Sequence, residues 1–382
     1  MKLFTTVRSV AAASLVAGLG LTASGVAGAS TSNHAERAQH ALFVETDATT
    51  GNTIISYTRG ADGTISYAGT YATGGLGLAA PGAVADPLAS QSGLTLIDNA
   101  KLLVATNPGS NTVSVFAVDG SRLDLVQQID SGGTFPNSVS SSGNLVAVLN
   151  AGGTGSVAEF RLVGDRLKAL DNQVRPLGLT KTGVPGFLYI AGQVGYTPDG
   201  SHLVITTKHS TDSFDVFSVG ANGQLGSAPV VTPADKPVPF AFNFDGAGNL
   251  VAVEAGGSFV STYAVHADGT LTLIGASVSD GAAALCWISS SKGFFFGDNA
   301  GSATVSSFTE NGTGAPILVN ANAGTTHAGT TDSSVSPDGN FLYVQSGGAG
   351  TLDVFSIGST GTLTPVETVF NMPVASEGIA AS

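Results

Sequence analysis

The chain has 382 residues and a net charge of −13 at neutral pH, from 14 Lys and Arg against 27 Asp and Glu. Binding of nucleic acid or of an anionic membrane through bulk charge needs an excess of basic residues, so this balance argues against both. Gly contributes 52 residues, which is about twice the usual share. The Gly residues are spread among runs rich in Val, Ile, Thr, Phe and Tyr, a pattern typical of many strands joined by tight turns. A single cysteine, Cys286, excludes an internal disulfide, a zinc site built on cysteines and a CxxC redox pair.

Residues 1–29 have the pattern of a secretory signal peptide. Two basic residues precede an apolar stretch at 10–26, and residues 27–29 read Ala-Gly-Ala, a small-x-small cleavage signature. A membrane anchor is the alternative, but Gly and polar residues interrupt the stretch and leave less unbroken apolar length than the ~20 residues of a span. We therefore expect a secreted protein, a flexible tether over residues 30–40 and no membrane attachment after the leader is removed.

One pattern recurs through residues 41–382: an apolar strand, a turn such as Ser-Pro-Asp-Gly, a second strand, a polar loop, a third strand of V-x-V-F type and a fourth strand. An aromatic residue marks the third strand of each copy. These residues are Tyr57, Phe116, Phe160, Phe217, Tyr263, Phe308 and Phe355. Their spacing fits four-stranded propeller blades of about 40–50 residues. Insertions at 74–93 and at about 175–187 account for the two longer intervals.

Seven marks predict an all-β fold, a seven-bladed β-propeller. The first copy, from Ala41 to about Tyr71, lacks an innermost strand, and residues 377–381 supply a spare one. We therefore expect a C-terminal strand to close the N-terminal blade and to hide two sheet edges. A pair of β-sandwiches or a β-helix is the alternative, but the period far exceeds the hexa- or nonapeptide unit of a β-helix. No window shows helical periodicity, so almost no helix is expected.

Chain direction sorts residues between the two ends of the predicted ring. The loops that cross between blades share one end, here called the crossover end, with the loops between second and third strands. The turns between first and second strands share the other, here called the turn end. The Asp residues of the Pro-Asp-Gly turns are interpreted as turn formers, since Pro presets φ and Gly supplies a positive φ. Polar residues of several blades should converge on the channel mouth at the crossover end, where a ligand pocket is expected.

Four polar residues at the crossover end are the strongest candidates for a shared site: Gln193, Lys208, Glu254 and Asn299. In a hydrolase, Glu254 is the candidate catalytic base or acid, Lys208 would stabilise charge, and Gln193 would orient water or substrate. The candidate ligand-binding residues are Asn299, Asp332, Phe240, Trp287, His209 and Asn150. An ion pair between Glu254 and Lys208 that fixes two neighbouring blades is the alternative interpretation.

Other reactive residue types carry weaker signals. Cys286 has no evident His base nearby, so burial against Trp287 is favoured over a nucleophilic role. His327 is interpreted as a surface residue. The sequence contains no G-x-S-x-G, HExxH, P-loop or EF-hand pattern, and neither a cofactor nor a metal site is predicted. Four residues at the crossover end could supply oxygen ligands to a divalent cation, although their spacing in the sequence does not require a cation. These residues are Glu254, Asp298, Asn299 and Asp332.

The repeats resemble those of the lactonase-type seven-bladed propellers, the family that contains bacterial 6-phosphogluconolactonase and fungal carboxymuconate cyclase. Residues 150–157 look like that family's N-Y-x-G-G-x-V segment. Exported bacterial lactonase-like members share four further segments, which are carried here by residues 193–200, 239–242, 253–255 and 286–287. The resemblance covers residues 41–382, and it implies a propeller fold and an activity on a lactone or a related ring.

The sequence departs from the sugar-lactonase branch of that family at two segments. Its Pro-Arg-His-type segment reads Pro-Val-Pro-Phe at 237–240, and its crossover His has no clear equivalent at 135–138. The missing cations and the acidic net charge argue against a phosphorylated sugar lactone. Two functions stay open: hydrolysis or isomerisation of a small lactone or related ring at the channel mouth, and non-catalytic binding of a ligand or protein. A monomer is expected in both cases.

Overall fold

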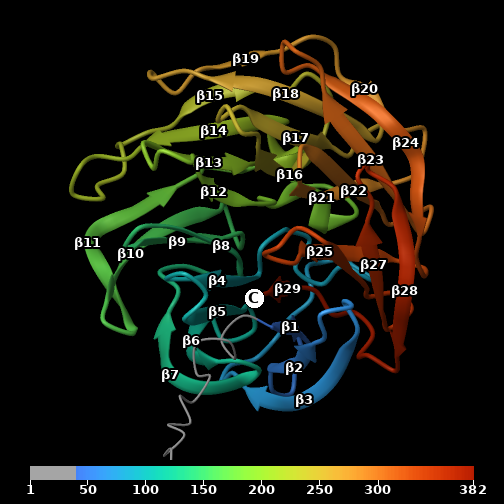
Figure 1. Cartoon of the computed structure of the whole chain (residues 1–382). Coiled ribbons are helices and arrows are strands. Elements are labelled where there is room, and N and C mark those ends of the chain that lie inside the picture. The colour runs from blue at the N-terminus through green and yellow to red at the C-terminus, as the bar shows by residue number, and fades with distance from the viewer. Residues whose placement is uncertain (1–39) are drawn as a thin grey trace, which may run out of the picture. The chain divides into compact units, whose positions relative to one another are not determined.

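The computed structural model describes residues 40–382, which form seven small antiparallel sheets arranged in a ring (Figure 1). Regular helical structure in that range is limited to two short 3-10 helices, η2 (Gly186–Tyr189) and η3 (Lys208–Ser210). The predicted all-β, seven-bladed propeller is therefore confirmed. The predicted leader and residues 30–39 of the tether lie outside the described residues. Within residues 40–382, no helix has the length and apolar character that crossing a membrane requires.

The strands follow one another in chain order around the ring. They are β1 (Ala41–Glu45), β2 (Thr53–Arg59), β3 (Ile65–Ala72), β4 (Leu94–Ile97), β5 (Leu102–Asn107), β6 (Thr112–Asp119), β7 (Arg122–Asp130), β8 (Pro136–Ser142), β9 (Leu145–Asn150), β10 (Ser156–Val163), β11 (Arg166–Pro176), β12 (Val194–Tyr196), β13 (His202–Thr206), β14 (Ser213–Ser218), β15 (Val230–Pro233), β16 (Pro239–Phe244), β17 (Leu250–Glu254), β18 (Phe259–Val265), β19 (Leu271–Leu273), β20 (Val278–Ser279), β21 (Leu285–Ser291), β22 (Phe294–Asn299), β23 (Thr304–Glu310), β24 (Pro316–Thr325), β25 (Thr330–Val335), β26 (Phe341–Ser346), β27 (Thr351–Ile357), β28 (Leu363–Phe370) and β29 (Ile379–Ala381).

Each blade pairs its strands in order from the channel outward. Blade 1 is β29-β1-β2-β3, and blades 2 to 4 are β4 to β7, β8 to β11 and β12 to β15. Blade 5 starts at β16, and its outer edge is split between β19 and β20, which both pair with β18. Blades 6 and 7 are β21 to β24 and β25 to β28. The predicted crossover and turn ends follow from this strand order.

The apolar core lies between neighbouring blades. Strand β5 reads Leu-Leu-Val-Ala-Thr-Asn and is buried at every residue, since blades cover both of its faces. The seven third-strand aromatic residues are each at most 4% exposed. Phe116, for example, packs in one cluster with Leu103 of its own blade and Phe43 of blade 1. The aromatic marks are therefore the residues that hold consecutive blades together.

Strand β29 closes the ring, as predicted. It pairs with β1 in antiparallel register, with Leu42 opposite Ala381 and Val44 opposite Ile379. Backbone hydrogen bonds of 3.3 and 2.9 Å between Ala41 and Ser382 extend the pairing by one residue. The inner edge of β1, which would otherwise present free N–H and C=O groups, is covered.

Hydroxyl side chains join the innermost strands of neighbouring blades. Such strands have a free edge, and their backbone groups need partners. Ser138 of blade 3 accepts a hydrogen bond from the amide of Val194 in blade 4 at 3.2 Å. Ser334 of blade 7 accepts one from the amide of Ala381 in β29 at 3.1 Å. These bonds account for the serine-rich inner strands, and they leave the channel with a polar wall.

Candidate functional site

The channel mouth expected at the crossover end is filled by the first insertion, residues 74–93, here called the plug segment. It contains no strand, yet Ala80, Leu88, Ala89 and Ser90 are each at most 2% exposed. The plug segment therefore folds into the ring and not over it. The open pocket expected at this end stays a prediction, and two of the residues expected to line it, Lys208 and Trp287, contact the plug segment.

Side chains of three parts of the ring hold the plug segment. Lys208 Nζ of blade 4 donates to the carbonyl of Ala89. Trp287 Nε1 of blade 6 donates to the carbonyl of Ser90 at 2.6 Å. The carboxyl of Glu377, which precedes β29, accepts from the Ser90 amide at 3.2 Å. Bonds from several blades to one segment close the crossover end of the channel.

A buried charged cluster underlies these bonds. Lys208 Nζ lies 4.9 Å from the centre of the Phe240 ring, and Phe240 packs on Trp287 with ring centroids 5.3 Å apart. Burial lowers the pKa of Lys208 to about 8, although Asp86 and Glu377 favour its charged form. Burial, followed by the neighbouring Asp86 carboxyl, raises the pKa of Glu377. Lys208, Phe240 and Trp287 thus contact one another, and Lys208 and Trp287 anchor the plug segment.

Glu254 is held by donors from its own blade and the loop before it. Tyr263 Oη donates to Oε1 and Ser261 Oγ to Oε2, each at 2.5 Å. The backbone amides of residues 235–236 donate at 3.1 Å. Burial raises the pKa of Glu254, and no ion pair joins it to Lys208 in the described chain. These contacts are those of a structural carboxyl group, and the catalytic role of Glu254 stays a prediction.

Three further predicted site residues also have hydrogen-bond partners within the fold. Gln193 bridges two inner strands, because it accepts from the amide of Phe242 at 2.7 Å and donates to its carbonyl at 3.1 Å. Asn299 Nδ2 donates to Ser306 Oγ at 2.8 Å. Asn150 Nδ2 donates to a backbone carbonyl at 2.9 Å. The structure does not bring these side chains together with Glu254 through any hydrogen bond in residues 40–382.

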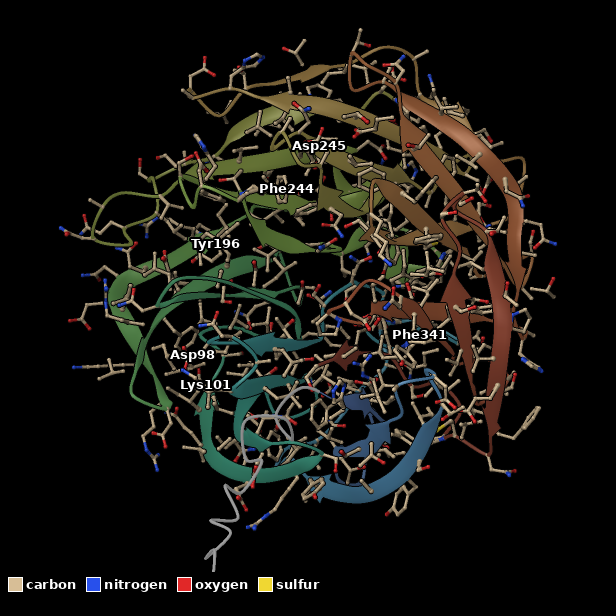
Figure 2. The ribbon with its side chains drawn as sticks, in the orientation of Figure 1. Asp98, Lys101, Tyr196, Phe244, Asp245 and Phe341 are labelled. Carbon is tan, nitrogen blue, oxygen red and sulfur yellow. The ribbon has the colours of Figure 1, made fainter. Side chains whose placement is uncertain are left out.

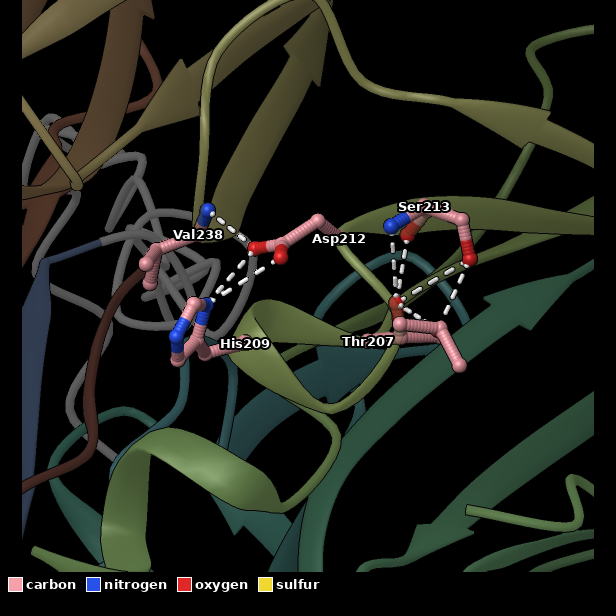
Figure 3. Close-up of polar contacts among 6 residues, drawn as sticks. Thr207, His209, Asp212, Ser213 and Val238 are labelled. Carbon is pink, nitrogen blue, oxygen red and sulfur yellow. Dashed lines mark hydrogen bonds and ion pairs between the residues drawn. The ribbon is translucent and has the colours of Figure 1, made fainter. Parts of the chain in front are cut away.

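His209 lies on η3 at the crossover end, where Figure 3 shows its contact with Asp212. Its Nδ1 is 3.1 Å from the Asp212 carboxylate, which also accepts from the Val238 amide at 2.9 Å. His327 is similarly held, with Nδ1 2.9 Å from Asp353. Both imidazoles are therefore fixed by a carboxylate.

The surroundings of Cys286 and the placement of the acidic side chains bear on two weaker predictions. Cys286 is half-buried and packs against the apolar cluster that contains Trp287. Burial of the thiol raises its pKa, so its nucleophilic thiolate form is disfavoured. Within residues 40–382, no group of three or more His, Cys, Asp or Glu side chains is placed to hold a metal ion. The four oxygen ligands named from the sequence for a divalent cation are therefore not grouped as a metal site in the part of the chain described.

Open space in the ring lies along the inner strands, beyond the plug segment. Two parts of about 280 Å³ each share Ser92, Thr95, Leu96 and Asn243, and together they form the central channel. Asp332 is the only carboxyl group among the residues that line either part, and no Lys, Arg or His lines them. The channel wall is otherwise made of hydroxyls, amides and small apolar groups.

Asp332 is 3% exposed at the start of β25. Burial raises its pKa to about 7, although backbone amides of Ser333, Ser92 and Ile379 favour the carboxylate. A carboxyl whose pKa is raised towards neutral can both hold and release a proton, which is the property that a general acid or base needs. The sequence predicted Asp332 as a ligand-binding residue, and the structure places it on the channel.

Three hydrogen-bond donors on the same part of the channel have no partner in the described chain. They are the hydroxyls of Ser92 and Ser290 and the Nδ2 group of Asn243, whose Oδ1 accepts from the next amide. Sequence analysis missed all three, because only closure of the ring places them beside Asp332. The serine-rich inner strands were the available signal.

Solved structures share this fold. A protein from Bacteroides fragilis, described as a candidate 6-phosphogluconolactonase, aligns over 90% of this chain and 97% of its own, with a TM-score of 0.68 and 19% identity. The periplasmic gluconolactonase of Pseudomonas aeruginosa aligns over 89% and 98%, with a TM-score of 0.66 and 19% identity. A protein from Lactobacillus plantarum aligns over 89% and 98%, with a TM-score of 0.69 and 16% identity.

Sequence comparisons add nothing to these structures: no protein-family model matches the chain, and no curated protein matches it. At identities of 16 to 19%, the structural likeness establishes the fold. In its fold, the chain is similar to the lactonase-type seven-bladed propellers, as its repeats predicted.

Proposed function

We propose that the protein hydrolyses a small, uncharged lactone in its central channel. The observation that carries the proposal is the placement of Asp332, whose pKa is raised to about 7, beside three unused donors in one polar cavity. The lactonase descriptions of the P. aeruginosa and B. fragilis structures support the substrate class. A cavity of about 280 Å³ in each part suits one small ring.

The reaction needs a base for water and donors for the carbonyl oxygen. Ionised Asp332 takes a proton from a water molecule, and the resulting hydroxide adds to the lactone carbonyl carbon. The oxyanion that forms accepts hydrogen bonds from donors such as Ser290 and Asn243. Asp332 then returns the proton to the ring oxygen as the acyl C–O bond breaks, which yields a hydroxy acid and leaves the enzyme unchanged.

The charge of the wall restricts the substrate. No Lys, Arg or His lines the channel, so a phosphate group would have no cationic partner there. The net charge of −13 adds repulsion. A phosphorylated lactone should therefore be a poorer substrate than its unphosphorylated form.

A lactone panel with a blocking variant tests the proposal. Wild type should hydrolyse at least one of glucono-1,5-lactone, galactono-1,4-lactone and a simple valerolactone above the spontaneous rate, measured by proton release. Ser290→Trp, which adds an indole to the channel wall, should remove at least nine tenths of that rate. Ser66→Trp is the control, since Ser66 is exposed on the outer strand β3.

The possible results separate the two functions named from the sequence. Turnover that Ser290→Trp leaves unchanged would contradict the channel as the site. Stabilisation of the protein by a lactone without any turnover would replace hydrolysis with non-catalytic ligand binding.

We also propose that the protein acts after export, on the basis of the leader pattern in residues 1–29. The expected result is a culture-medium protein whose first residue is Ser30, read by mass spectrometry of the intact chain. A chain that starts at Met1 and stays with the cells would contradict export.

A further inference from the structure

The largest of the cavities described for this chain lies outside the channel, at the turn end between blades 4 and 5. Its volume is about 600 Å³. It is lined by the turn that leads into β13, by residues 245–248 before β17 and by residues 265–267 at the end of β18. Figure 2 labels Asp245, which lines this cavity, and Tyr196 at the end of β12 in the neighbouring blade. We call it the turn-end pocket.

A chain of hydrogen bonds fixes the imidazole of His202 in this pocket. Ser201 Oγ donates its only proton to the Asp199 carboxylate, whose oxygens lie 2.9 and 2.8 Å away. Ser201 Oγ must therefore accept from His202 Nδ1, which is 2.8 Å away. In the neutral ring, Nε2 then carries the free lone pair.

The His202 side chain is nearly buried, and one of its two ring nitrogens has no hydrogen-bond partner among residues 40–382. It is 6% exposed, it lines the pocket, and its Nε2 makes no hydrogen bond within the described chain. A ligand that donates a hydrogen bond to Nε2 would supply the missing partner.

The remaining polar groups of the pocket make its field negative. Hydrogen bonds from Thr197 and Ser201 lower the pKa of Asp199 to about 2, so this carboxyl is ionised. Asp245 is a second carboxyl on the wall, His266 is a second imidazole there, and no Lys or Arg lines the pocket. The pocket thus offers hydrogen-bond acceptors and negative charge.

We propose that the turn-end pocket binds an organic cation with N–H donors, a guanidinium or primary ammonium group, which donates to His202 Nε2 and pairs with Asp199. Such a group matches both the acceptors and the charge of the wall. An anion would be repelled, and a neutral carbonyl compound would leave Nε2 without a donor. The site is independent of the lactone chemistry in the channel.

Two sources can supply this chemistry: a free polyamine, and an Arg side chain of a peptide or protein. Isothermal titration calorimetry should therefore use spermidine for the first and N-acetylarginine methylamide for the second. N-acetylcitrulline methylamide, which has the same shape as the arginine probe without its charge, is the neutral comparison. Binding of either cation supports the proposal, and the one that binds identifies the source.

Blade 7 supplies matched variants, because its turn reads Ser-Pro-Asp-Gly-Asn-Phe where blade 4 reads Thr-Pro-Asp-Gly-Ser-His. His202→Phe copies the blade 7 residue, and Asp199→Asn removes the charge of the turn. Asp338→Asn makes the same change in the blade 7 turn, where Asp338 binds Ser336 Oγ at 2.6 Å but does not line the pocket.

Both His202→Phe and Asp199→Asn should weaken cation binding at least tenfold, and Asp338→Asn should leave it unchanged. Lactone turnover should be the same in all three variants. The proposal is overturned if wild type binds neither cation, if it binds the citrulline probe as tightly, or if the two pocket variants bind as wild type does.

Discussion

Asp332→Asn is expected to lower the rate of lactone hydrolysis at pH 8 by roughly two to four orders of magnitude. Asparagine keeps the size of the side chain but cannot take a proton from water. The measurement is the initial rate with the best lactone of the panel, after subtraction of spontaneous hydrolysis. Asp353→Asn is the matched control, because Asp353 is a blade 7 carboxyl with 3% exposure that does not line the channel. This control should keep its rate within a few-fold of wild type.

The pH dependence of the wild-type rate provides a second readout of the same group. Because burial raises the pKa of Asp332 to about 7 and only the carboxylate acts as a base, the rate should rise with pH and level off above about 7. A flat profile between pH 5.5 and 8.5, or an Asp332→Asn rate within tenfold of wild type, would remove Asp332 from the mechanism.

The free energy of unfolding is expected to fall as the pH rises from about 4 to about 7. Burial raises the pKa of Asp332, Glu159 and Glu310 to about 7 in the folded state. The folded state therefore keeps protons that the unfolded state has already released, so stability is lost as these groups ionise. For Asp332, the loss is on the order of 4 kcal/mol. Solvent screening reduces the contributions of the less buried Glu159 and Glu310.

Urea unfolding at pH 4.5, 5.5, 6.5 and 7.5 measures this slope. Asp199, whose pKa is lowered to about 2, stabilises the fold above about pH 4 and loses that effect in stronger acid. The maximum of stability should therefore lie near pH 4–5, below the usual range. Asp332→Asn should flatten the slope between pH 5 and 7. Equal midpoints at pH 4.5 and 7.5 in wild type would contradict the raised pKa values.

The ring was predictable because its signals are local and repeated. Every blade places its third-strand aromatic residue in the same environment between two sheets. Tyr57 of the first copy and Phe355 of the last are therefore both aromatic and buried, although they are far apart in the sequence. The missing inner strand of the first copy and the spare strand at 379–381 were likewise visible in the sequence. Each of these signals needs only the blade period and the burial of apolar residues.

The plug segment carries no such period. Its path depends on single contacts with Lys208 and Glu377, which come from other parts of the ring and recur nowhere else. The only signal in the sequence was composition, since Asp86 is the one charged residue of segment 74–93. The sequence therefore contained no sign that Lys208 and Trp287 bind one buried loop, and the prediction assigned both residues to the wall of an open pocket.

The pairing of β29 with β1 sets the order in which the molecule can be completed. The bonded residues Ala41 and Ser382 are 341 positions apart. Blade 1 therefore lacks its innermost strand, β29, while every later blade is being synthesised. Contacts of this separation form slowly, because a long stretch of chain must first be brought together. The nascent polypeptide thus stays unfinished until translation has passed residue 381, so blade 1 is the last blade of the ring that can close.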